Sequence, residues 1–217
     1  MIKLTIWAPV LAATLCAGTV QARPIANKPG QYAPHDTCKA DPKAASFVQA
    51  LKAAQEDRSA AAIKALAGPE FTGGFGGEVS IDDVMDDFSS DPFQWTLFGR
   101  TLSLGCKLEG DKLTLPWFFT LDFGNLDMTD KLLAVGNAVP VYVSQSPKSK
   151  VIGKLNWQLV QLAGAKLPEL TMLKVRLLGG KLTGYVREEQ LRSQFDQRLV
   201  AVKVAGEWKI NALVSGD

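Results

Sequence analysis

The stretch VPVYVSQSPKSKVIGKLNWQLVQL, residues 139 to 162, decides which fold class we expect for the second half of the chain. In it, two runs of alternating apolar and polar residues flank a turn built from Ser, Pro and Lys. Such alternation is typical of half-buried β-strands, and Ser and Pro favour turns. Further short strands with regular turns follow, so we expect a small β-barrel or β-sandwich over residues 131–191.

The first half of the chain carries helical patterns instead. Apolar residues recur at helical spacing from residue 44, and a second short helix begins after Ser59 and stops at Gly68. Ser80 is a good N-cap for the segment IDDVMDDF. The preceding stretch, FTGGFGGEVS from residue 71, indicates a glycine-rich loop.

A further helix, PFQWTLFGRTLSLG from residue 92, has Phe93, Leu97, Thr101 and Leu104 on one face, and we expect this face to be buried. After Cys106 the apolar period changes to two, and the chain ends in an expected hairpin around residues 205–206. The sequence therefore predicts an α+β fold, in which an α-helical N-terminal half packs with a C-terminal β-hairpin.

The N-terminus has the pattern of a signal peptide. Residues 1–22 combine Lys3, an apolar run and the small-residue site VQA, and the run is short for a membrane span. Residues 23–37 are rich in Pro, Gly and polar residues, which favours a flexible leader. We therefore expect a soluble protein exported to the periplasm or the extracellular space, without stable membrane insertion after cleavage. An uncleaved anchor is the alternative.

Removal of the signal peptide takes Cys16 with it and leaves Cys38 and Cys106. An oxidising compartment favours a disulfide between them over two free thiols. The bridge would close a loop of about 69 residues, which contributes roughly 4 kcal/mol in the chain-entropy model. No CxxC spacing is present in the sequence, so the cysteines indicate neither a zinc site nor a redox motif.

Composition argues against several classes of partner. The chain has 217 residues with 24 basic and 22 acidic side chains, a net charge of +2, and 47% hydrophobic residues. This balance lacks the basic face that nucleic-acid binding requires, so we expect no nucleic-acid partner.

The sequence also offers few groups for catalysis. The one histidine, His35, lies in the expected leader, and the usual hydrolase, metalloprotease and phosphate-binding motifs are missing. Carboxylates at residues 82, 83, 86 and 87 suit a solvated helix start better than a calcium site. We therefore expect no metal, no cofactor and no enzyme activity.

Residues 139 to 191 resemble the bacterial Src-homology-3-like (SH3-like) modules of exported proteins. The matching pieces, in order, are VYVSQSP, KVIGKLNWQLV, LKVRLLGGKLTGYV and REEQL. Tyr185 stands where the family usually has a Trp. The resemblance implies a small SH3-like β-barrel over residues 131–191.

The flanking segments FVQALKAAQEDRSAAAIKALAGPEFTGGFGG, WTLFGRTLSLGCKL, LPWFF and GEWKINALVSGD resemble a group of uncharacterised exported bacterial proteins with an SH3-like module. The helical start and the closing hairpin are also loosely similar to the cone-shaped nuclear-transport-factor-2-like proteins. The resemblance implies one α+β domain over 38–130 plus 192–217, with the barrel as an insertion between its helices and last strands.

These features favour a non-catalytic binding protein of the cell envelope. Expected partners are peptidoglycan, its stem peptides or an envelope protein, and the expected site is a groove on the barrel or the crevice between the two parts. Aromatic residues can line such a groove, and the candidates are Tyr142, Tyr185 and Trp157. Of these, we expect the two tyrosines to be exposed, since a phenol can face water at one end.

Two alternatives remain open from the sequence. One is a small-molecule-binding protein or a His-independent enzyme, with a pocket in the helical part that contains Asp82, Asp86 or Asp122. The other is a passive structural subunit with neither a pocket nor a groove.

Overall fold

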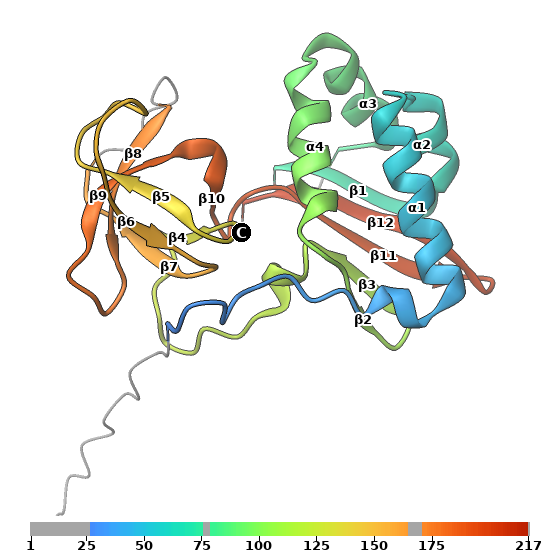
Figure 1. The fold of residues 1–217 in the computed structure, drawn as a ribbon. Coiled ribbons are helices and arrows are strands. Elements are labelled where there is room, and N and C mark those ends of the chain that lie inside the picture. The colour runs from blue at the N-terminus through green and yellow to red at the C-terminus, as the bar shows by residue number, and fades with distance from the viewer. Residues whose placement is uncertain (1–26, 76–78, 165–170, 217) are drawn as a thin grey trace, which may run out of the picture.

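Two β-sheets organise the chain in the computed structural model, which describes residues 27–75, 79–164 and 171–216 (Figure 1). The first sheet has five strands in the order β1-β12-β11-β3-β2, and the second has seven in the order β10-β4-β7-β8-β9-β5-β6. Within the described residues, four α-helices accompany the first sheet. The expected α+β class is confirmed.

The four helices are α1 (Pro42–Glu56), α2 (Ala60–Leu66), α3 (Ile81–Ser90) and α4 (Phe93–Ser103). Three of them, α1 to α3, begin at side-chain caps, whereas the N-cap residue of α4 is Pro92, which makes no such bond. Asp41, Ser59 and Ser80 each accept a hydrogen bond from the backbone N–H three residues ahead. The Ser80 hydroxyl also donates to Asp83 Oδ2 at 2.6 Å. The N-cap side chain of α3 therefore bonds both the backbone and the side chain of the third helical residue.

The first sheet contains β1 (Ala67–Phe75), β2 (Lys107–Glu109), β3 (Lys112–Leu115), β11 (Arg198–Val204) and β12 (Glu207–Ser215). The predicted terminal hairpin is β11–β12, and its turn residues Ala205 and Gly206 have φ values of 50° and 83°. Such positive φ angles suit the primed turns that match strand twist. One expectation was wrong: residues 71–75 are part of β1, which pairs parallel with β12, and do not form a loop.

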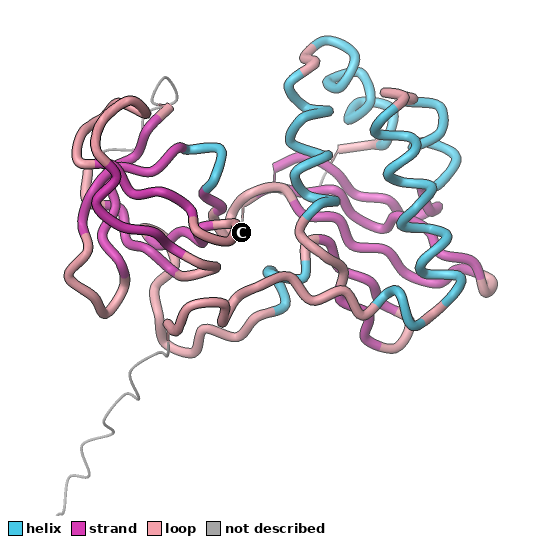
Figure 2. The backbone as a smooth tube through the Cα atoms, in the orientation of Figure 1, coloured by secondary structure: helices cyan, strands magenta, loops and turns pink. Residues whose placement is uncertain are grey.

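A single apolar core joins the helices to the first sheet, and together we call them the helical part. Phe47, Ile63, Met85 and Phe98 from the four helices meet strand residues such as Leu199 in this core. Figure 2 shows the helices gathered over one face of the sheet. The layer arrangement follows from this, because each helix buries one apolar stripe and the sheet buries one face.

The face that we expected α4 to bury is buried only in part. Thr101 and Leu104 are buried as expected and Leu97 is half-buried, but the helix turns a different face to that core. Trp95, Phe98 and Leu102 are buried against the core, whereas Phe93 is 50% exposed. The helix has two apolar stripes, and the stripe with the larger aromatic side chains packs into the core. The second stripe, with Leu97 and Thr101, lines a cavity described below.

The second sheet, here the β part, is inserted in the chain between η2 (Trp117–Thr120) and β11. Its strands are β4 (Lys131–Ala134), β5 (Val139–Tyr142), β6 (Val151–Leu155), β7 (Leu159–Leu162), β8 (Met172–Leu177), β9 (Thr183–Arg187) and β10 (Leu191–Arg192). Every one of these strands contributes a buried residue to one apolar core. Within the segment REEQL, the short 3-10 helix η3 (Glu188–Gln190) precedes β10.

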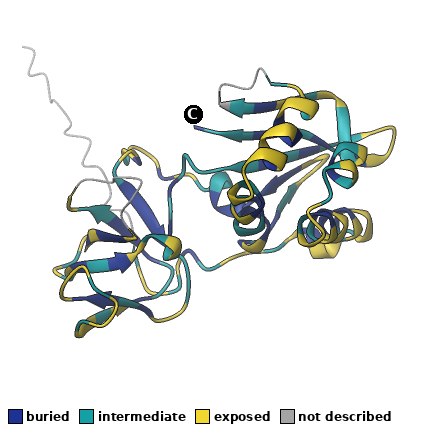
Figure 3. Ribbon diagram, turned by 90° about the horizontal axis from the view of Figure 1, so that it is seen from above, coloured by how far each residue is buried: buried dark blue, intermediate teal, exposed yellow. Residues whose placement is uncertain are grey.

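The β part is not a closed barrel. Its pairing order begins at β10 and ends at β6, and these two edge strands are not paired with each other in the described residues. The sheet instead encloses its core by twisting and by a register shift in β5 at Val141/Tyr142. Buried residues gather inside both parts (Figure 3).

The N-terminal segment, residues 27–37, is not a free leader in the structure. The N–H groups of Gly30 and Tyr32 donate to the carbonyls of Asn156 and Trp157, at 2.7 and 3.2 Å. Tyr32 is buried, with its ring 5.8 Å from that of Phe123. The segment is held by a third apolar cluster that lies between the two parts of the chain.

The signal-peptide prediction for residues 1–22 lies outside the described residues. None of the helices in the described ranges combines the length and the apolar character that a bilayer crossing needs.

Candidate functional site

A cavity of about 200 Å³ lies where the helical part meets the β part. We call it the central cavity. Its wall comes from α4, from η2, from the segment that connects η3 to β11, and from the end of β12. The lining residues are Leu97, Arg100, Thr101, Leu104, Pro116, Phe118, Phe119, Glu188, Arg192, Ser193, Phe195, Asp196, Gln197 and Ser215.

Helix α4 supplies one wall through the stripe that the core does not use. Leu97, Thr101 and Leu104 recur at helical spacing and therefore lie on one side of the helix. The Thr101 hydroxyl lies 3.1 Å from the carbonyl oxygen of Leu97 and 3.2 Å from that of Gln197. Gln197 lies 96 positions further on, in residues 191–197, which connect η3 to β11 and which we call the connecting segment. The contact therefore ties the connecting segment to α4.

Aromatic rings form the apolar floor. Phe118 is fully buried, and its ring lies 6.0 Å from that of Phe119. The guanidinium of Arg198 lies over the Phe119 ring at 5.6 Å and donates to the carbonyl of Gly216. Both rings of the floor therefore have packed neighbours.

Four charged side chains line the rim and walls of the central cavity: Arg100, Arg192, Glu188 and Asp196. Arg100 Nη1 lies 3.8 Å from Glu188 Oε2, which is a long ion pair. Arg192 Nη1 donates at 2.6 Å to the carbonyl of Leu191. No carboxylate among the described residues forms an ion pair with Arg192.

The surroundings of Arg192 disfavour its charge. Burial, and after it the nearby charge of Arg100, lowers the pKa of the Arg192 guanidinium. Arginine nevertheless stays protonated in proteins, so the cavity wall carries a partly desolvated positive charge without a direct anionic partner.

The hydroxyl and carboxyl groups of the connecting segment are used within a tight turn. Asp196 Oδ2 accepts from the Ser193 N–H at 2.8 Å, and Ser193 Oγ accepts from the Phe195 N–H at 3.2 Å. These bonds fix the turn and engage the serine oxygen and one oxygen of the carboxylate. No histidine is among the cavity's lining residues.

The carboxylates proposed for a catalytic alternative lie elsewhere. Asp82, Asp86 and Asp122 are all exposed, and none of them lines the central cavity. Asp82 pairs with Lys64 at 2.8 Å, and Asp122 accepts from the N–H of Gly124.

The three aromatic candidates do not form one site. Tyr142 and Tyr185 are register partners on β5 and β9, so they lie on the same face of the sheet. Tyr142 is buried, against our expectation of exposure, and Tyr185 is half-buried. Trp157 packs with the cluster that holds the N-terminal segment, and its Nε1 donates to Asn137 at 3.1 Å. None of the three lines the central cavity, and their role in binding stays a prediction.

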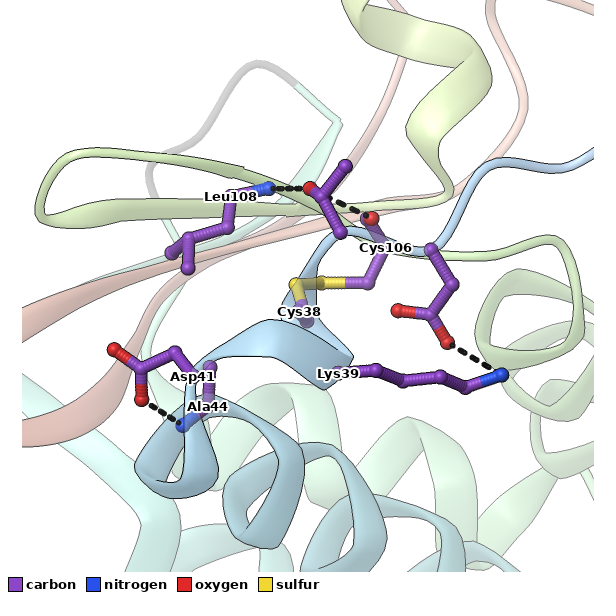
Figure 4. Close-up of a disulfide and its surroundings, with 8 residues drawn as sticks. Cys38, Lys39, Asp41, Ala44, Cys106 and Leu108 are labelled. Carbon is purple, nitrogen blue, oxygen red and sulfur yellow. Dashed lines mark hydrogen bonds and ion pairs between the residues drawn. A yellow bond between two sulfur atoms is a disulfide. The ribbon is translucent and has the colours of Figure 1, made fainter.

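The predicted disulfide between Cys38 and Cys106 is confirmed, with Cα atoms 5.7 Å apart (Figure 4). It joins the segment before α1 to the segment after α4, as expected. Asp36 lies close enough to the two sulfurs for the three side chains to form a possible set of metal ligands. Because both sulfurs are bonded to each other, the thiolates that a metal requires are not available.

A second hollow, larger and more open, lies between α1 and β12. Its volume is about 460 Å³, and it is lined by residues that include Phe47 and Trp208. Lys43 and Glu207, its charged pair, bond each other at 2.8 Å. The central cavity is the stronger candidate, because it is the more enclosed of the two and combines aromatic rings with four charged side chains.

Sequence reasoning identified the crevice between the two parts as a possible site but missed the residues that form it. Arg100 and Arg192 are separated by 92 positions and belong to no motif, and only the packing of the β part against α4 brings them together. Comparison of the chain with protein-family models, with curated proteins and with solved structures finds no match.

Proposed function

We propose that the protein is an exported, non-catalytic binding protein of the cell envelope, and that its ligand binds in the central cavity. The observation that carries the proposal is the cavity itself: an apolar floor, a partly buried arginine without an anionic partner, and hydroxyl groups engaged in local hydrogen bonds. Binding sites in proteins commonly combine apolar walls with a few placed polar groups.

Export is supported by the signal-like pattern of residues 1–22 and by the disulfide, which is compatible with an oxidising compartment. We further propose that residues 131–191 form an SH3-like module. This proposal rests on the motif order in the sequence and on seven short strands around one core. Such a module in an exported protein favours a cell-wall stem peptide, or an envelope protein, as the ligand.

A retention experiment tests this function. The chain without its predicted signal peptide is incubated with purified cell-wall sacculi, and the bound fraction is measured after sedimentation. Leu97→Trp should fill the cavity and abolish retention, because Leu97 lies in its wall. Thr96→Trp is the matched control: Thr96 is the exposed neighbour on the same helix, so this variant should be retained like the unmodified chain.

Each outcome decides between sites. Loss of retention with Leu97→Trp alone supports the cavity. Loss only when Tyr142 and Tyr185 are replaced by Ala would move the site to the tyrosine pair on β5 and β9. Failure of the unmodified chain to bind sacculi would contradict the proposed cell-wall ligand.

A further inference from the structure

We propose that the central cavity binds the carboxylate of a small acid with an apolar body, such as the C-terminal residue of a peptide, with the carboxylate held between Arg100 and Arg192. The inference rests on the proposed function, because it specifies the ligand of the same cavity. It follows from the charge, the size and the lining of the cavity, taken in turn.

The lining carries two arginines and two carboxylates, so its charges balance overall, and Asp196 and Glu188 act on Arg192 through their charge. What Arg192 lacks, among the described residues, is a direct ion pair. Asp196 is engaged by the Ser193 N–H, and Glu188 faces Arg100 at 3.8 Å, so both carboxylates of the lining have partners. The remaining charge is Arg192, which is half-buried and donates only to a main-chain carbonyl. A partly desolvated guanidinium gains most from a ligand anion, because a charge-assisted hydrogen bond replaces the lost water.

Within the described residues, only one guanidinium of the lining lacks a direct ion pair, and two carboxylates lie near it, so an anion of low charge is favoured. A carboxylate carries one negative charge and matches the planar fork of a guanidinium. A phosphate monoester would bring about 1.5 to 2 negative charges next to Glu188 and Asp196, where like-charge repulsion disfavours it.

The size and the floor define what is attached to the carboxylate. A cavity of about 200 Å³ is smaller than the roughly 300–1,000 Å³ that encloses a drug-sized ligand. It therefore suits one end of a chain or one small acid. Leu97, Pro116 and Phe119 would contact the body of this ligand, and such walls favour a short apolar side chain over a charged one.

Calorimetric titration at low salt tests the proposal on the chain without its predicted signal peptide. The first probe is N-acetyl-Ala-Ala with a free carboxylate, and its matched control is the same dipeptide as the C-terminal amide. We expect the acid to bind at least about tenfold more tightly than the amide, as the loss of a charged hydrogen bond implies. Butyrate is the second probe, which separates a free small acid from a peptide end, and inorganic phosphate should not compete.

Three variants locate the binding. Arg192→Gln and Arg100→Gln should each weaken binding of the acid about tenfold or more, and should leave binding of the amide unchanged. Arg192→Lys keeps the positive charge but lacks the planar guanidinium. Its affinity for the acid should therefore lie between that of the glutamine variants and that of the unmodified chain. Arg176→Gln makes the same charge change at an exposed site on β8 and should have no effect. Thermal unfolding of each variant checks that it is folded.

The outcomes separate this inference from the function on which it rests. Equal binding of acid and amide, or equal weakening by Arg176→Gln and Arg192→Gln, would overturn the carboxylate proposal, even if sacculi retain the protein through the cavity. Binding of the acid without retention on sacculi would support the carboxylate site and contradict the cell-wall ligand. If butyrate binds tightly and the dipeptide does not, the carboxylate that the cavity binds belongs to a free small acid and not to a peptide end.

Discussion

Asn27 shows how much one side chain can organise in this molecule. Its amide nitrogen donates to the carbonyls of Leu159 and Leu178, both at 2.9 Å, and its oxygen accepts from the Leu159 N–H at 2.8 Å. The contacts span more than 130 positions of sequence. A polar residue in a Pro- and Gly-rich stretch thus fixes the N-terminal segment to the β part, and nothing in its local sequence indicates this role.

We expect Asn27→Ala to destabilise the protein by about 2 kcal/mol, because the partly buried Leu159 N–H and Leu178 carbonyl both lose the side chain that they bond. Hydrogen exchange of the Leu159 amide should speed up at the same time. Chemical denaturation and exchange followed by NMR measure both effects. Gln31→Ala is the control, since Gln31 is exposed and accepts only from Lys28. Equal effects of the two variants would contradict the anchoring role of Asn27.

Asp41, the N-cap of α1, gives a prediction about pH. The hydrogen bond from the Ala44 N–H, with a smaller contribution from Lys203, lowers the pKa of the Asp41 carboxyl below its ordinary 3.8. A folded pKa below the unfolded value means that the ionised group adds stability above pH 3.8, and that this stability is lost as the pH falls through the folded pKa.

We therefore expect the unmodified chain to melt at a higher temperature than Asp41→Asn at neutral pH, and the difference to shrink as the pH falls below 3.8. Thermal unfolding followed by circular dichroism across this range measures it. Asp41→Ser, another uncharged N-cap, should give the same pH dependence as Asp41→Asn. A difference that stays constant from neutral to acid pH would show that the charge of Asp41 has no part in it.

At the scale of elements, α4 has two apolar faces with different tasks. Trp95, Phe98 and Leu102 pack into the core of the helical part, while Leu97 and Thr101 line the central cavity. Phe88 on α3 contacts Trp95 edge to face, with ring centroids 4.9 Å apart. A helix with apolar side chains on two faces needs partners on both, and the β part supplies the second.

This division of α4 makes a testable contrast between two phenylalanines of one helix. Phe98→Ala should cost about 3–5 kcal/mol of stability, because Phe98 is fully buried and its removal leaves a cavity. Phe93→Ala, at a residue that is 50% exposed, should stay within about 0.5 kcal/mol. Urea denaturation of both variants measures the difference. Similar losses for the two would mean that the helix is rotated relative to our description.

At the scale of the whole molecule, three connections hold the architecture. The disulfide joins the start of α1 to the end of α4, the N-terminal segment bonds to the β part, and the connecting segment bonds to α4 through Thr101. The last of these lies in the wall of the central cavity, because Thr101 and Gln197 both line it. The geometry of the cavity therefore depends on how the connecting segment is held against α4.

Replacing Cys38 and Cys106 together by Ser should lower the free energy of unfolding by about 4 kcal/mol, from the entropy of a loop with a sequence separation of 68. Guanidinium denaturation with and without reductant measures the effect. The unmodified chain should lose stability on reduction, and the double variant should be insensitive to reductant. Sensitivity of the double variant would mean that the reductant acts elsewhere.

Part of the structure follows from local sequence. Caps at Ser59 and Ser80 and the alternation over residues 139–162 predicted helices and strands, because these depend on neighbours in the chain. Cys38 and Cys106 predicted the disulfide, since an oxidising compartment favours a bridge over two free thiols. Local sequence did not predict that residues 71–75 join a sheet, that α4 turns Phe98 inward, that the β part stays open, or that Arg100 and Arg192 line one cavity. Those outcomes depend on contacts between distant residues, whose competition for burial leaves no local pattern.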